Sequence, residues 1–214
     1  MLDNNMKKMI AFSIPMVALV GMTISPLLTI TTGKEIKLET KPVDPRDLFR
    51  GDYVTLSYQA EEVHESKLDN AVKDYFLEQN ASSYRDEPLV VYSVLKENKN
   101  GIYEVDKVVT EKPKTGVFLE GEMDYLWIKS DEEIREYAES EKDFESIKAN
   151  QTADIYYELD KFFVPENTGK ELEDAINQVD SVVDFNSEEE GSPAIATIKV
   201  RNGHAILTNV EAQD

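Results

Sequence analysis

Apolar positions are distributed very unevenly along the chain, and the longest uninterrupted run lies near the N-terminus. Residues 9–30 carry no charged side chain, and at about 1.5 Å per residue a run of this length can cross a bilayer as a helix. Pro15, Gly21 and Pro26 would disfavour a helix in water, but membrane helices tolerate them. The pattern predicts a transmembrane helix over residues 9–30, preceded by an N-terminal tail of residues 1–8.

The flanks of this run predict how it is inserted. Lys7 and Lys8 precede it, and no small-residue cleavage site follows Ile30, so we expect an uncleaved signal anchor rather than a cleaved signal peptide. Basic residues also follow the run, which alone would favour the opposite orientation, but long domains are translocated largely regardless of their charge. We therefore expect a single-pass protein of the cell membrane, with a cytoplasmic N-terminus and an extracytoplasmic C-terminal domain.

The rest of the chain mixes runs that alternate with period two and runs with helical period. Two Asn-Gly pairs, at residues 100–101 and 202–203, each separate two β-rich runs, which is typical of hairpins. Helices are expected to begin at Ser66, at Ser130 (as far as about Lys148) and at Thr168. The expected strands are 36–38, 53–58, 89–95, 102–109, 116–119, 125–128, 155–164, 194–200 and 204–210.

This order has no strict βαβ alternation, so it predicts an α+β fold with a mainly antiparallel sheet and a few helices. Closure of that sheet into a barrel-like form is left open. Residues 31–41 are expected to form a juxtamembrane linker and the first strand, and residues 42–214 a single extracytoplasmic domain of ordinary size. The chain has no cysteine, which excludes disulfides, thiolate metal sites and a cysteine nucleophile. A cysteine-free exported chain suits a bacterium, and we expect a Gram-positive one.

Charge narrows the range of partners. The chain carries a formal net charge of −20; residues 1–33 contribute +1, so the remainder carries −21. A field of this sign repels nucleic acid, which we exclude as a partner, and could attract cations or basic proteins. The acidic runs 131–133 and 188–190 could bind a divalent cation weakly, but neither matches an EF-hand loop, and a solvated acidic face is the default interpretation.

Candidate chemistry is sparse. His64 and His204 are the only histidines, and neither has the spacing of a zinc site. The pair Gly169-Lys170 lacks the glycine and the hydroxyl residue of a phosphate-binding loop. We therefore assign no catalytic residue, metal or cofactor, although the 43 acidic residues leave a hydrolase that uses two carboxylates open as an alternative.

Residues 51–58 form the most distinctive motif, Gly-Asp-Tyr-Val-Thr-Leu-Ser-Tyr. The glycine permits a conformation that other residues adopt at a cost, and the aspartate can close an Asx-type turn. On the strand that follows, alternate side chains share a face, so Leu56 and Tyr58 are expected to point into the core together. A structural role is thus favoured over a binding role. The motif residues singled out are Arg50, Gly51, Asp52, Tyr53, Leu56 and Tyr58.

With its lead-in, residues 42–50, and a second block later in the chain, this motif resembles the GDYXXLXY family of bacterial membrane-anchored proteins. The resemblance implies an extracytoplasmic domain, a polytopic membrane protein as partner, and no established reaction. We therefore expect a non-enzymatic binding or accessory module of the envelope. The alternatives are a hydrolase acting on the cell wall and a sensor of divalent cations or envelope stress. The residues of the second block are Phe163, Pro165, Glu166, Gly169 and Glu171.

Overall fold

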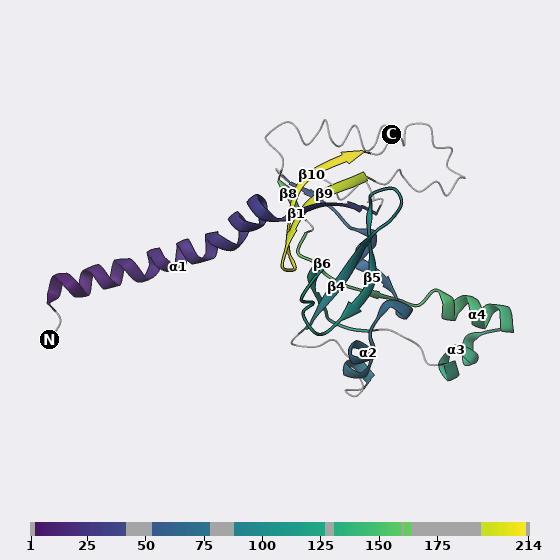
Figure 1. Cartoon of the computed structure of the whole chain (residues 1–214). Coiled ribbons are helices and arrows are strands. Elements are labelled where there is room, and N and C mark those ends of the chain that lie inside the picture. Colours follow the sequence, from purple (N-terminus) through teal and green to yellow (C-terminus); the bar gives the residue numbers. More distant parts are fainter. Residues whose placement is uncertain are drawn as a thin grey trace.

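A computed structural model of the chain describes residues 3–41, 53–77, 88–126, 131–159, 161–163 and 194–212. A long helix, α1 (Asn4–Thr32), projects from a body made of short antiparallel sheets (Figure 1). Within this helix, Ala11–Thr32 is long and apolar enough to cross a membrane, and its most apolar 18-residue window, with a mean hydropathy of 1.8, contains no buried residue. The span predicted over residues 9–30 lies inside α1.

The sheet nearest to α1 has the order β1-β9-β10 and is antiparallel throughout. Its strands are β1 (Lys34–Glu39), β9 (Ala194–Arg201) and β10 (His204–Ala212). Every second residue of β9 is buried, as expected for a strand with one face on the core. Asn202 and Gly203 both have positive φ, of 53° and 92°, so the hairpin predicted at this Asn-Gly pair is confirmed.

A second antiparallel sheet has the order β5-β4-β6. Its strands are β4 (Leu89–Glu97), β5 (Tyr103–Val109) and β6 (Val117–Met123). The hairpin predicted at Asn100-Gly101 joins the first two, and Gly101 has a φ of 78°. The strand predicted at 125–128 is wrong for Tyr125 and Leu126, which are not in a strand; residues 127 and 128 lie outside the described ranges.

Two pairs of very short strands complete the described sheets, and both pairs are antiparallel. The first pair is β2 (Tyr53–Thr55) with β8 (Lys161–Phe163), and the second is β3 (Glu62–His64) with β7 (Thr152–Asp154). The fold is therefore α+β as predicted, and among the described strands no sheet closes into a barrel. The single strand predicted over 155–164 is wrong, because the backbone turns at Glu158, whose φ is 55°.

Two helix predictions need correction. The helix expected from Ser66 begins later, as α2 (Asn70–Leu77), after 3₁₀ turns at Gln59–Glu61 and Glu65–Lys67. The helix expected over 130–148 is two helices, α3 (Asp131–Tyr137) and α4 (Glu141–Ala149). The reason lies at Ser140, whose hydroxyl accepts a hydrogen bond from the backbone N–H of Asp143 at 3.2 Å. Serine is a favoured N-cap, so a new helix starts there.

One hydrophobic cluster joins both three-stranded sheets, the β3–β7 pair, α2 and the end of the motif. These elements therefore share one hydrophobic core. Its largest fully buried side chains include Tyr58, Leu38, Leu119, Met123, Ile155 and Ile198.

Candidate functional site

The junction between α1 and the body is packed and has no flexible linker. Thr29 is only 1% exposed, and its hydroxyl lies 3.2 Å from Nδ1 of His204 at the start of β10. The ammonium of Lys199 donates to the carbonyl of Ile30 at 3.0 Å, where it satisfies one of the carbonyls left free at the helix end and complements the helix dipole. A single residue, Gly33, separates α1 from β1, and a Cβ there would overlap the carbonyl oxygen of Thr29. The last turn of α1 is thus fixed against the β9–β10 hairpin.

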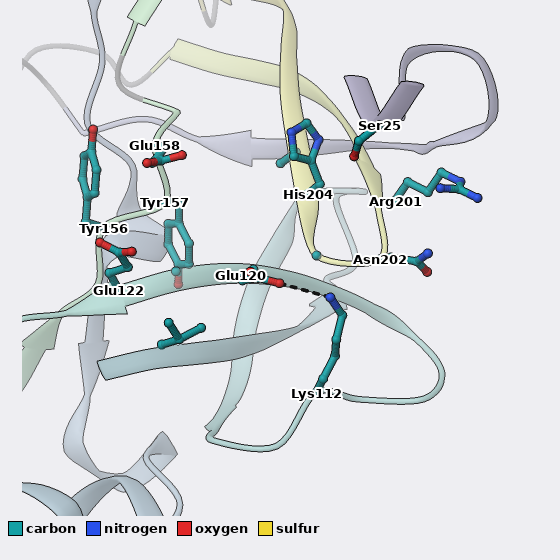
Figure 2. A pocket seen from close by; sticks show the side chains of 14 residues that line it. Ser25, Lys112, Glu120, Glu122, Tyr156, Tyr157, Glu158, Arg201, Asn202 and His204 are labelled. Carbon is teal, nitrogen blue, oxygen red and sulfur yellow. Dashed lines mark hydrogen bonds and ion pairs between the residues drawn. The ribbon is translucent and has the colours of Figure 1, made fainter. Parts of the chain in front are cut away.

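A polar cavity of about 490 Å³ opens beside this junction (Figure 2). Strand β6 forms its floor, and the β9–β10 turn and the segment 156–158 form two of its walls. Lys112 from the loop before β6, Val90 of β4 and Ser25 of α1 also line the cavity. The site therefore combines α1, β4, β6 with its preceding loop, the segment 156–158 and the β9–β10 turn, which explains why no local sequence motif indicated it.

Backbone hydrogen bonds from β6 fix the two walls. The N–H of Glu120 donates to the carbonyl of Gly203 at 3.0 Å, and Glu122 and Tyr156 exchange two bonds of 2.9 Å. The bonded positions are two residues apart on one strand, so the walls stand about 7 Å apart along it. Gly121 lies between them, and a Cβ there would come within 2.8 Å of the Ile155 and Tyr157 side chains. Glycine is needed at this position for the close approach of wall and floor.

Charges are separated along the cavity. Glu122 and Glu158 lie at one end, and Arg201 lies at the other, as Figure 2 shows. Lys112 is paired with Glu120 at 3.1 Å, so these two charges offset each other. No described residue forms a hydrogen bond or ion pair with the side chains of Glu122, Glu158 or Arg201. Within the described ranges, the carboxylates at one end of the cavity and the guanidinium at the other therefore have no partner.

The backbone of Glu158 is held in a conformation that residues other than glycine rarely adopt. Its φ of 55° places it in the left-handed region, and both of its neighbours are anchored. The hydroxyl of Tyr157 donates to the carbonyl of Ala60 at 3.0 Å and lies 2.6 Å from the hydroxyl of Ser93. The carbonyl of Leu159 accepts from the hydroxyl of Tyr58 at 2.9 Å. Strained backbone conformations of this kind persist only where the surrounding structure fixes them, and they are concentrated at functional sites.

Two buried tyrosines, Tyr157 and Tyr58, anchor the segment that contains Glu158. Burial raises the pKa of Tyr157 well above its ordinary value of 10.0, so its hydroxyl stays protonated. Tyr58 is 0% exposed and belongs to the 51–58 motif. The motif therefore supports the cavity indirectly, through the hydrogen bond that fixes Leu159.

The described motif residues behave as core and sheet positions. Leu56 is 4% exposed and, with Tyr58, lies in the core as their alternation predicted. Tyr53 pairs with Phe163 across β2 and β8, so the structure brings the motif and the second block together, which the sequence did not predict. That the role of the motif is structural rather than ligand-binding stays a prediction. The remaining predicted residues, namely Arg50, Gly51, Asp52, Pro165, Glu166, Gly169 and Glu171, lie outside the described ranges.

Metal binding has no support within the described ranges, because they contain no group of three or more histidine or acidic side chains that could hold an ion. Of the acidic runs, residues 131–133 begin α3, and residues 188–190 are not described. Reasoning from the sequence missed Glu122, Glu158 and Arg201. His204, which it excluded from a zinc site, is exposed at the start of β10. Of the regions that line the cavity at these residues, only the Asn-Gly turn beside Arg201 could be predicted from the local sequence.

Fold and site together define an α+β domain with a polar cavity, carried on one helix that is long and apolar enough to span a membrane. The family model described as GDYXXLXY protein matches residues 15–210. The chain therefore belongs to the GDYXXLXY family. No curated protein and no solved structure matches it.

Proposed function

We propose that this protein is a non-enzymatic, single-pass module of the cell membrane whose extracytoplasmic domain binds a polytopic membrane protein. The domain comprises residues 42–214, and the sheet begun by β1 joins it to the anchor. The lysines before α1 support a cytoplasmic N-terminus, and membership of the GDYXXLXY family supports the envelope location.

The observation that carries this proposal is the rigid mounting of the domain. In a protein that needs only to be retained at a membrane, a flexible linker is enough to connect the domain to its membrane helix. Here the last turn of α1 is packed on β9 and β10 through Thr29 and Lys199, and β1 starts after one residue. The lipid-facing side of α1 and the adjoining face of the domain therefore form one surface of fixed geometry. A partner that lies both within and above the membrane can contact both parts at once, and the fixed geometry lowers the entropy cost of that contact.

A flexible insertion tests the importance of this mounting. Six Gly/Ser residues inserted between Gly33 and Lys34 should leave the domain folded but uncouple it from α1. The same insertion between Asn100 and Gly101, at an exposed hairpin tip, is the matched control, because such sites tolerate extra residues. A photoreactive side chain at Gly21, where an added Cβ meets nothing within 4 Å, and another at Asn202, an exposed residue of the β9–β10 turn, report contacts of the helix and of the adjoining face of the domain in native membranes.

The expected result is that the same multi-span protein, identified by mass spectrometry, crosslinks to the helix position and to a position on the domain. The junction insertion should reduce the crosslink to the domain, and the hairpin insertion should not. If both insertions leave all crosslinks unchanged, the rigid mounting has no role in association. If no multi-span protein is captured from either position, the proposed partner class is wrong.

A further inference from the structure

We propose that the tip of the β9–β10 hairpin, residues 199–204, contacts the membrane surface, and that Arg201 there binds the phosphate of an anionic phospholipid. The lipid belongs to the bilayer that α1 crosses. The contact joins one guanidinium to one phosphate, and the cavity carboxylates take no part, because Figure 2 shows Arg201 on the far side of the turn from Glu122 and Glu158. This inference goes beyond association with a protein partner and does not depend on it.

One face of the hairpin tip is directed towards α1. Lys199 and Arg201 alternate with the buried residues of β9, so their side chains share the outer face of the sheet. His204 lies directly opposite Arg201 in the register of the two strands, and opposite residues point to the same side of a sheet. Lys199 and His204 both contact the last turn of α1, at 3.0 Å and 3.2 Å. The outer face of the tip is therefore the side on which α1 lies.

The same contacts place the tip at the level of the lipid headgroups. About 20 residues of helix cross a hydrocarbon core, so a span that begins near Ala11 ends near Ile30. Lys199 donates to the carbonyl of Ile30 and therefore lies at the outer edge of that core, where headgroups occupy roughly the next 5–8 Å. Ser25, within the same span, lines the same cavity as Arg201. The end of β9 thus lies in the headgroup layer.

The hairpin tip is basic in a chain that is otherwise strongly acidic. The chain has 43 acidic residues, but residues 194–210 contain none and include Lys199 and Arg201. On the neighbouring strand β1, Glu35 lies opposite Lys199 rather than Arg201. Within the described ranges, the side chain of Arg201 has no hydrogen bond or ion pair. Its guanidinium can therefore receive a phosphate, which it is shaped to bind through two parallel N–H bonds.

The lack of acidic residues in the hairpin determines which headgroup is preferred. A zwitterionic headgroup brings an ammonium together with its phosphate, and residues 194–210 offer no carboxylate to receive it. Phosphatidylglycerol has a phosphate and no amine, so it carries a net negative charge. Each lysine or arginine close to an anionic lipid surface strengthens binding about fivefold. We therefore expect phosphatidylglycerol to be bound in preference to phosphatidylcholine.

The charge of the rest of the domain favours the same orientation. Residues 131–149, which form α3 and α4, include eight acidic and three basic residues. These helices lie at the opposite end of the body from α1 (Figure 1). An anionic surface repels this acidic end and attracts the hairpin tip. Phosphate binding at Arg201 therefore acts together with the packed junction to hold the tip against the bilayer.

The test uses the full-length protein in nanodiscs of phosphatidylcholine that contain phosphatidylglycerol as the minor lipid. Lys7→Gln and Lys8→Gln are introduced throughout, so that lipids held at the other end of α1 are not counted. Native mass spectrometry measures the ratio of phosphatidylglycerol to phosphatidylcholine that the released protein retains. The site variant is Arg201→Gln, and Arg201→Lys keeps the charge. Lys142→Gln, an exposed position on α4, is the matched control.

We expect the parent protein to retain phosphatidylglycerol in excess of its share of the nanodisc, and Arg201→Gln to lower this enrichment about fivefold. Arg201→Lys and Lys142→Gln should keep the parent value. An unchanged melting temperature of Arg201→Gln assigns the loss to binding rather than unfolding. Enrichment in the parent should also fall as salt is raised, a readout that needs no variant.

Three results would overturn the proposal. The first is retention of the two lipids by the parent protein in proportion to their content in the nanodisc. The second is an enrichment that Arg201→Gln leaves unchanged. The third is an equal loss in Arg201→Gln and Lys142→Gln, which would show that the net charge of the domain, and not the hairpin tip, determines lipid retention.

Discussion

Leu56→Ala is expected to lower the free energy of unfolding by about 2–5 kcal/mol, the usual cost of deleting a buried leucine side chain. Leu56 is 4% exposed and belongs to the main hydrophobic cluster. The truncation removes apolar contacts and leaves a cavity that a close-packed core fills only in part. Thermal and urea unfolding of the full-length protein in mild detergent would measure the change.

Val90→Ala on β4 is the matched control for this loss. Val90 is 42% exposed, so its truncation should cost less than about 1 kcal/mol. Equal effects of the two substitutions, or an unchanged melting curve for Leu56→Ala, would show that the motif face is not part of the core. The binding interpretation of the motif would then gain support.

Gly121→Ala is expected to destabilise the protein by about 1–3 kcal/mol, the typical cost of overpacking a close-packed interior. The new Cβ would lie 2.8 Å from side-chain atoms of Ile155 and Tyr157, and 2.9 Å from the carbonyl oxygen of Tyr156. That oxygen cannot retreat without breaking the 2.9 Å hydrogen bond that it accepts from Glu122. The same unfolding measurements apply, and the cavity wall should be displaced as well.

Gly21→Ala is the control for this second substitution. An added Cβ there meets nothing within 4 Å, and alanine is the better helix former, so stability should be unchanged or slightly higher. A Gly121→Ala protein as stable as the parent would mean that β6 and the segment 155–157 lie farther apart than described.

Local signals in the sequence predicted local structure well. Both Asn-Gly pairs mark hairpins because the turn itself requires positive φ at these positions, and the uncharged run predicts α1. The errors arise where distant contacts decide the outcome. The strand expected over 155–164 is interrupted at Glu158 because Tyr58 and Tyr157 anchor the backbone on either side. Nothing in the local pattern of residues 155–164 records either anchor.

The candidate site was less predictable than the fold, for the same reason. Its charged groups, Glu122, Glu158 and Arg201, come from three separate segments, and each alone is an ordinary solvated residue. The pairing of Tyr53 with Phe163 likewise joins two blocks more than a hundred residues apart. The missed break between α3 and α4 is different: Ser140 is a local N-cap, and its signal was present in the sequence.

We propose that the domain lies outside the cytoplasm and is fixed against the membrane surface. The chain contains no cysteine, so one introduced thiol is a unique label site. Glu145→Cys on α4 and Asn202→Cys in the β9–β10 turn are both exposed positions. Helix α4 lies far from α1 in Figure 1, whereas Asn202 is two residues from His204, whose Nδ1 is 3.2 Å from the Thr29 hydroxyl of α1. The measurement is the rate at which a membrane-impermeant maleimide labels each thiol in intact cells.

Residue 145 should be labelled rapidly, residue 202 markedly more slowly, and both at equal rates once detergent removes the bilayer. Protection of residue 145 until the cells are opened would place the domain in the cytoplasm. Equal rates at the two sites in intact cells would show that the β9–β10 turn does not lie at the membrane, and either result would overturn the proposed placement of the domain.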